Sequence, residues 1–180
     1  MMRWSGLLAV LAAVGVVAAG PTLGTVGTVS NGSGSSGETV FESAVVGNPP
    51  GMTGAPGAIR GIDAAGAPWK VAKREAELDE DGRLEVEVEG LVLDLPGNPL
   101  DGTTGTVTGV RASLTCQGTN VVATTGVVPL SSDGDAEIEE DLVLPAMCVA
   151  PIILVRIGST TTNPGPLMGA WIGATGFSSP

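Results

Sequence analysis

Residues 74–95 read REAELDEDGRLEVEVEGLVLDL, and this stretch decides the fold class. Apolar and acidic residues alternate strictly over Arg83–Glu89, so one face of an extended chain would be aliphatic and the other acidic. Alternation with a period of two is typical of a half-buried antiparallel β-strand. The run at 74–78 leads into Asp81-Gly82, which is a strong hairpin turn signal. The stretch therefore predicts two antiparallel strands joined by a tight turn.

The alternation changes phase at Gly90, because the leucines that follow it occupy odd positions, 91, 93 and 95. A β-bulge or a bend at the glycine would explain this change. Before it, the row Glu85, Glu87 and Glu89 is interpreted as a solvated face that keeps a sheet edge from pairing with a neighbour. Attraction of a basic partner is the alternative function for this row.

Other β-prone runs alternate with turn clusters, and none shows helical spacing of apolar residues over a helical length. The run at 148–157, CVAPIILVRI, is apolar at odd and even positions, which predicts a central strand with Pro151 near its start. Glu140 interrupts the alternation at 136–144, so we expect a bulge or an edge position there, because burying an unpaired carboxylate is costly. Further strands are expected at 41–46, 69–73, 107–116, 121–128 and 168–177.

These runs predict an all-β fold, an antiparallel two-sheet sandwich of about seven to nine strands. A partly open β-barrel is the alternative. Trp69 follows a glycine- and alanine-rich loop, and we expect it to be buried at one end of the core rather than exposed as a binding anchor. No internal repeat is visible, which argues against a propeller or a solenoid.

The N-terminal residues 1–19 have the parts of a secretory signal peptide. Arg3 supplies a positive charge, residues 7–19 are free of charge, and Val17 and Ala19 are small enough to precede cleavage before Gly20. A retained membrane anchor is the alternative, but the apolar run is shorter than the roughly 20 residues that span a bilayer. We therefore expect export, cleavage and no stable membrane insertion afterwards.

Residues 20–38 are rich in glycine, serine and threonine, which predicts a flexible linker. Residues 39–180 then form a single β domain, which is long enough to bury one core. Asn31-Gly32-Ser33 in the linker matches an N-glycosylation acceptor, which matters only in a host that modifies such sites.

The chain has two cysteines, Cys116 and Cys148, and export would place them where oxidation is favoured. A disulfide is expected, and a catalytic thiol is the alternative. The chain has no histidine and no tyrosine, so Ser-His-Asp, Cys-His and histidine-zinc arrangements are excluded. No catalytic residue is assigned, and we expect a protein that is not an enzyme.

Acidic residues outnumber basic ones by 19 to 8, for a net charge of -11. Such a surface disfavours binding to nucleic acid. An extracellular protein or a basic surface remains as the expected partner. The acidic turns are candidates for Ca²⁺ ligation, with hairpin-turn chemistry as the alternative explanation. Their candidate ligands are Asp79, Asp81, Asp133 and Asp135. A carboxylate-dependent hydrolase is a third possibility, and no other cofactor is expected.

The segments IRGIDAAGAPWKV, DGRLEVEVEGLVL, GTTGTVTGVRASLTC, VPLSSDGDAEIEEDLVLP, MCVAPIILVRI and WIGATGF lie within residues 58–177. In this combination the chain resembles a group of secreted bacterial proteins of unknown function. The resemblance implies one exported domain with a bridged cysteine pair, and it implies no activity and no site residue. The expected function is that of a secreted, non-enzymatic binding or surface-associated domain, with a calcium-stabilised adhesion-like module as the alternative.

Overall fold

The structure, a computed structural model, describes residues 37–117, 121–159 and 169–176. The predicted signal peptide and all of the predicted linker before Gly37 lie outside these residues, as do Asn31, Met168 and Phe177. The described chain is all-β, and the one helical element within it is the 3-10 turn η1 (Ala55–Gly57). No helix of this part is long and apolar enough to cross a membrane.

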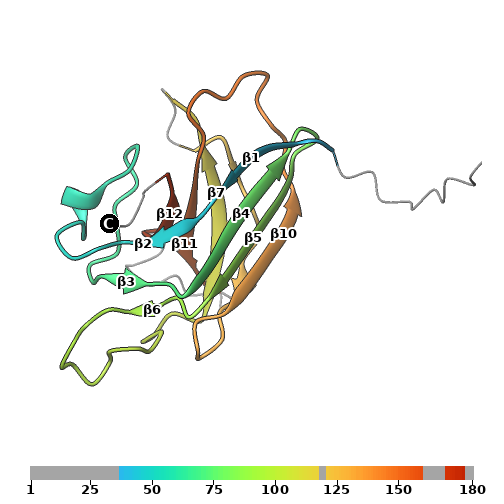
Figure 1. The fold of residues 1–180 in the computed structure, drawn as a ribbon. Helices are drawn as coiled ribbons and strands as arrows, with labels where there is room; N and C mark the ends of the chain where they lie inside the picture. Colours follow the sequence, from blue (N-terminus) through green and yellow to red (C-terminus); the bar gives the residue numbers. More distant parts are fainter. Residues whose placement is uncertain (1–36, 118–120, 160–168, 177–180) are drawn as a thin grey trace, which may run out of the picture. The chain divides into compact units, whose positions relative to one another are not determined.

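The hairpin predicted at 74–89 forms the centre of a four-stranded antiparallel sheet, here called sheet A. Its strands are β1 (Thr39–Ser43), β4 (Lys73–Asp79), β5 (Arg83–Glu89) and β10 (Ala136–Asp141), in the order β1-β4-β5-β10. In the hairpin Leu78 pairs with Leu84 and Lys73 with Glu89. The green hairpin and the orange β10 lie side by side in Figure 1.

A second antiparallel sheet, sheet B, contains the predicted central strand. Its strands are β2 (Val45–Gly47), β12 (Trp171–Thr175), β11 (Ile152–Gly158), β7 (Gly109–Thr115) and β8 (Ala123–Thr124), in that order, with β9 (Val128–Pro129) also paired to β7. A separate ribbon pairs β3 (Trp69–Lys70) with β6 (Val92–Leu93). The strand β11 lies between β7 and β12, and Pro151 comes directly before it, as predicted.

The two sheets share one apolar core. It includes Leu84, Val86 and Val88 of β5, the even-numbered residues of β7 between 110 and 114, and Ile153 and Val155 of β11. Neither sheet closes on itself, so the chain forms a sandwich-like fold and not a barrel. In the described part of the chain, seven strands have five residues or more, and the other five are two- or three-residue segments. These short segments raise the total above the expected seven to nine.

The chain leaves sheet A at Gly90, whose φ of 66° is a conformation that glycine adopts without strain. The leucine run that follows does not continue β5, and part of it forms β6 in the separate ribbon. The phase change therefore marks a bend and not a bulge within one strand. Glu140 lies on the edge strand β10 without a register shift, and its exposed carboxylate accepts a hydrogen bond from the Gly126 N–H at 2.6 Å.

The strand β11 is apolar at odd and even positions because other parts of the chain cover both of its faces. Its odd-numbered residues face the sandwich core, whereas Leu154 packs on the other side with Ile62, Ala64 and Trp171. These residues form a second, smaller core between the outer face of sheet B and the segment that follows η1. The segment is joined to β12 by an isolated bridge between Ala64 and Trp171.

The outer face of sheet A carries rows of glutamates. The strand register places Glu42 opposite Glu77, Glu77 opposite Glu85, and Glu85 opposite Glu139. Lys73 and Arg83 are the cations that pair on this face, with Glu87 and Glu139 respectively, both at 2.7 Å. The glutamates of β5 lie in the interior of the sheet, so they do not protect an edge, contrary to the interpretation of the sequence.

Replacing Glu85 with lysine is expected to raise the free energy of unfolding by about 0.5 kcal/mol, because like charges placed directly opposite each other destabilise a sheet. The new ammonium would lie between the carboxylates of Glu77 and Glu139. Urea unfolding at low ionic strength measures the change. Glu80→Lys, in the exposed β4–β5 turn, alters the net charge equally and is the control. A gain of the same size in both variants would contradict the prediction.

Candidate functional site

An apolar pocket of about 370 Å³ opens at the surface near the β3–β6 ribbon. Three segments surround it: the chain from residue 65 into β3, the chain from β6 to residue 107, and the end of β11. Its lining consists of aliphatic side chains, one tryptophan, two glycines and two threonines: Ala65, Gly66, Ala67, Trp69, Leu93, Leu95, Leu100, Thr104, Gly105, Thr106, Val107 and Ile157.

The inner wall of the pocket belongs to the main core. Trp69, Leu93 and Ile157 are buried members of the core cluster, which makes this wall rigid. Leu100 is 50% exposed, so this side chain forms part of the mouth. Trp69 is 4% exposed, which confirms that it is buried in the core, and it also forms part of the pocket wall.

The loop that carries Leu95 and Leu100 is held by Asp101. Its carboxylate accepts the Leu95 N–H at 2.8 Å and pairs with the Lys70 ammonium at 3.4 Å. These two donors lower the pKa of Asp101 below its usual value. The stabilisation is therefore complete above the usual aspartate pKa of about 3.9 and is lost as the pH falls through the lower folded-state value.

Backbone hydrogen bonds add to the order of this loop. The Leu93 N–H donates to the Thr103 carbonyl at 2.8 Å, and the Gly102 N–H donates back to the Leu93 carbonyl at 3.0 Å. The Leu100 N–H is bound by the Asn98 side chain at 2.9 Å. The mouth is thus formed by a folded turn, and the pocket exists before any ligand arrives.

The lining determines what the pocket can do chemically. Among the described residues that line it, none is titratable, and the polar side-chain groups are the two threonine hydroxyls and the indole N–H of Trp69. A dry cavity of about 150 Å³ lined by apolar residues binds benzene, so this larger pocket has room for an apolar molecule of two or more rings. The pocket is suited to binding, and the residues described in its wall include no general acid or base.

The predicted disulfide is present between Cys116 and Cys148, whose Cα atoms are 5.1 Å apart. It joins the end of β7 to the segment before β11, next to the pair Thr115 and Ile152. The pocket uses Ile157, near the other end of β11, so the disulfide lies away from it. The bond accounts for both cysteines, and it is typical of a protein from an oxidising compartment.

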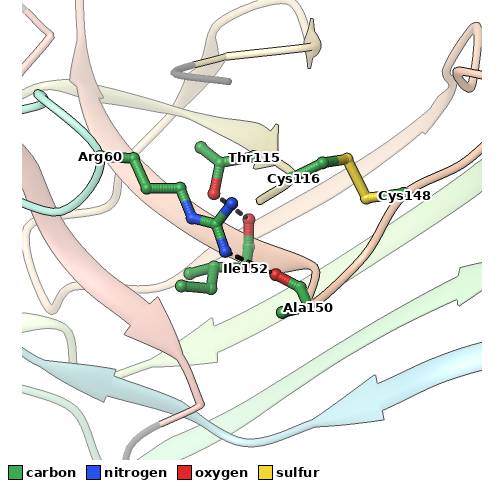
Figure 2. The surroundings of a disulfide bond; sticks show 6 residues. All are labelled: Arg60, Thr115, Cys116, Cys148, Ala150 and Ile152. Carbon is green, nitrogen blue, oxygen red and sulfur yellow. Dashed lines mark hydrogen bonds between the residues drawn. A yellow bond between two sulfur atoms is a disulfide. The ribbon is translucent and has the colours of Figure 1, made fainter. Parts of the chain in front are cut away.

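A hydrogen bond from Arg60 to Ala150, here called the clasp, lies beside the disulfide and helps to hold the second core in place. Figure 2 shows the Arg60 guanidinium reaching the Ala150 carbonyl, at 2.7 Å from Nη2, close to the hydrogen bond that Thr115 donates to the Ile152 carbonyl. Arg60 and Ala150 both have positive φ values, 49° and 48°, which are strained for residues with a side chain. This clasp ties the segment after η1 to the chain between Cys148 and β11.

The four calcium candidates do not come together. Asp79 and Asp81 lie at the β4–β5 turn, whereas Asp133 and Asp135 precede β10. The register pairs Ala136 with Val88, so the two turns lie at opposite ends of β5, roughly 20 Å apart at 3.3 Å per residue. Within the part of the chain that is described, no three histidine, cysteine or carboxylate groups are arranged to hold a metal ion.

Three of these aspartates instead accept hydrogen bonds in or beside the turns that carry them. Asp79 is buried and accepts a hydrogen bond from the Thr39 hydroxyl, and Asp81 contacts the Arg83 N–H. Asp135 accepts the Gly90 N–H at 2.9 Å and so holds the bend that follows β5. Asp133 is exposed. These contacts match the alternative that the acids serve the turns.

Four glutamates of the hairpin line a shallow hollow of about 120 Å³ on the outer face of sheet A: Glu75, Glu77, Glu85 and Glu87. The strand register explains this, because it places them in two directly opposed pairs. The hollow lies on an open sheet face, and Glu87 is engaged by Lys73. A carboxylate-dependent hydrolase needs one carboxyl shielded from water to act as the acid, and the hollow has no apolar wall for that.

Comparison of the chain with protein-family models, with curated proteins and with solved structures finds no match. The function therefore has to be inferred from the chain's own residues.

Sequence reasoning missed the pocket, apart from Trp69. One signal was present: Leu100 is an apolar residue within the run of turn-forming residues at 96–102, where no strand accounts for it. Such an isolated leucine indicates a loop that packs against another part of the chain. The other sides of the pocket, at 65–67 and at Ile157, are distant in sequence, so the pocket could not be assembled from the local pattern.

Proposed function

We propose that this chain is an exported, non-enzymatic β-domain that binds a small, uncharged apolar molecule in the pocket beside Trp69. The observation that carries the proposal is a preformed 370 Å³ pocket with an aliphatic and aromatic wall and no charged side chain among the residues that line it. Pockets of about 300–1,000 Å³ with such a lining are typical of ligand sites.

Export is supported by the signal-like N-terminus and by the disulfide. The net charge of -11 keeps the domain soluble and disfavours anionic ligands in a pocket whose described lining contains no cation to neutralise them. The lack of histidine in the whole chain and of titratable groups in the pocket wall favours binding over catalysis.

Titration with N-phenyl-1-naphthylamine, a neutral fluorophore that brightens in apolar surroundings, tests the proposal on the full chain. We expect saturable binding at one site per chain. Ala67→Phe places a ring in the pocket and should weaken binding at least tenfold. Ala146→Phe adds the same ring at an exposed position outside the pocket and should leave binding unchanged.

If circular dichroism shows that Ala67→Phe is unfolded, Leu100→Asp is the second variant. This substitution places a carboxylate at the half-exposed mouth, where the leucine side chain of the parent contributes little to the core. It should weaken binding of the neutral fluorophore at least tenfold. Absence of saturable binding by the parent chain, or equal binding by folded pocket variants, would overturn the proposal.

A further inference from the structure

Two arginines lie directly opposite each other on sheet B. Arg111 of β7 and Arg156 of β11 are register partners, and both are half-buried. They face away from the sandwich core, because their neighbours Val110, Ala112 and Ile157 are core residues. This face is the opposite side of β11 from the apolar pocket.

The two guanidinium groups converge on Gly169. A β-carbon at this glycine would lie 2.7 Å from Arg156 Nη2 and 3.8 Å from Arg111 Nη2. Two cationic groups from different strands thus lie close to the same point, and Arg156 occupies part of the space that a side chain at residue 169 would need. The φ of Gly169, 90°, also favours glycine at this position.

No carboxylate compensates these two charges among the residues that the structure describes. The cations of the ion pairs found there are Lys70, Lys73 and Arg83. Burial, followed by the charge of Arg111, lowers the pKa of Arg156. An arginine with a lowered pKa is still protonated at neutral pH, so two positive charges face each other here.

A structural role accounts for only one member of the pair. Arg156 donates from Nε to the Gly169 carbonyl at 2.6 Å and from Nη1 to the Ser113 hydroxyl at 3.2 Å, which ties the start of β12 to β11 and β7. Arg111 is different, because its Nε is buried and has no hydrogen-bond partner. A buried donor without a partner is costly, and an acceptor supplied by a ligand would remove that cost.

We propose that Arg111 and Arg156 form a binding site for a small oxyanion of the phosphate or sulfate type. An oxyanion between them would accept from Arg111 Nε and from the Nη2 groups that converge at Gly169. A planar guanidinium binds such oxygens in a bidentate manner, and the anion would also cancel the repulsion between the two cations. The site is independent of the apolar pocket, since it uses the other face of β11.

The experiment is a thermal unfolding series on the full chain at pH 7 with sodium phosphate, sulfate, glycerol phosphate or acetate, each at ionic strength matched with chloride. We expect phosphate and sulfate to raise Tm above chloride, and acetate to do so less. Glycerol phosphate separates the two sources of the oxyanion, because only a site open enough for an ester responds to it as it does to inorganic phosphate.

Arg111→Gln removes one charge and is expected to abolish the phosphate-induced rise in Tm. Without phosphate, this variant should be at least as stable as the parent chain, because the repulsion has been relieved. Arg74→Gln removes another half-buried strand arginine that has no ion pair in the described part of the chain, and it is the matched control. It should retain the full response.

A second measurement uses the parent chain and does not depend on the variant folding. The ¹⁵N resonances of Arg111 Nε and Arg156 Nε should shift during titration with inorganic phosphate, while that of Arg74 Nε should not. An equal rise in Tm with chloride, an equal response of folded Arg111→Gln, or unshifted Arg111 and Arg156 resonances would overturn the proposal.

Discussion

Replacing Trp171 with alanine is expected to lower the free energy of unfolding by about 3–5 kcal/mol, the usual cost of deleting a fully buried aromatic ring. Trp171 is 1% exposed and packs with Leu154, Ala64 and Ile62 in the second core. Its indole N–H also donates to the Gly57 carbonyl at 3.0 Å. The ring therefore joins sheet B to the segment that covers its outer face.

The backbone contacts of Trp171 remain in the alanine variant. Its N–H donates to the Asp63 carbonyl at 3.0 Å, and its carbonyl accepts the Ala65 N–H at 2.8 Å. The measured loss can therefore be assigned to the side chain. Equilibrium urea unfolding gives the magnitude, and faster hydrogen exchange at Ala64 and Ala65 would locate the effect in the covering segment.

Trp171→Phe is the control, because it keeps a ring and loses the donor to Gly57. Trp171→Phe should lower the free energy of unfolding by about 1–3 kcal/mol, the penalty for a buried carbonyl left without its partner. This loss should be smaller than the loss in the alanine variant. A loss under about 1 kcal/mol for Trp171→Ala would show that the second core contributes little, contrary to the burial described above.

Removal of the disulfide has the second-largest expected effect. The double substitution Cys116→Ala and Cys148→Ala should lower the free energy of unfolding by about 2–5 kcal/mol. The bridge spans a sequence separation of 32, and the loop it closes contains β8, β9 and β10. Without the bridge, this loop is no longer closed in the unfolded chain, so the conformational entropy of the unfolded chain rises. The ends of β7 and β11 also lose their covalent link.

Thermal unfolding with and without a reductant measures this effect. The parent chain should lose stability in dithiothreitol, whereas the double variant should not respond to it. Because the disulfide and the pocket lie near opposite ends of β11, the affinity for N-phenyl-1-naphthylamine should be unchanged under conditions in which both proteins are folded. An unchanged melting temperature in the double variant would contradict the prediction.

Strong local patterns predicted most of the core. The alternation at 83–89, the Asp81-Gly82 turn and the doubly apolar run before residue 157 each correspond to a strand or turn of the structure. The pairing of Cys116 with Cys148 was also predictable, because the chain has no other cysteine. In each case the information lies within a few residues, or no competing partner exists.

Strand predictions were inaccurate where the neighbouring strand determines where a strand begins and ends. Residues 41–46 were expected to form one strand, yet β1 belongs to sheet A and β2 to sheet B. The expected strand at 121–128 is represented by β8 and β9, two short segments paired to different parts of β7. A strand ends where its neighbour ends, and apolar alternation within one segment carries no information about that neighbour.

The sequence by itself determined an all-β chain, the buried face of its main strands and the one possible disulfide, because these follow from alternation with a period of two and from composition. Only the tertiary structure decided which strands are neighbours. That choice brings Leu100 to Ile157 at the pocket and sets Arg111 opposite Arg156 above Gly169. The physical reason is that pairing between strands depends on contacts between residues that are tens of positions apart, and no local pattern contains them.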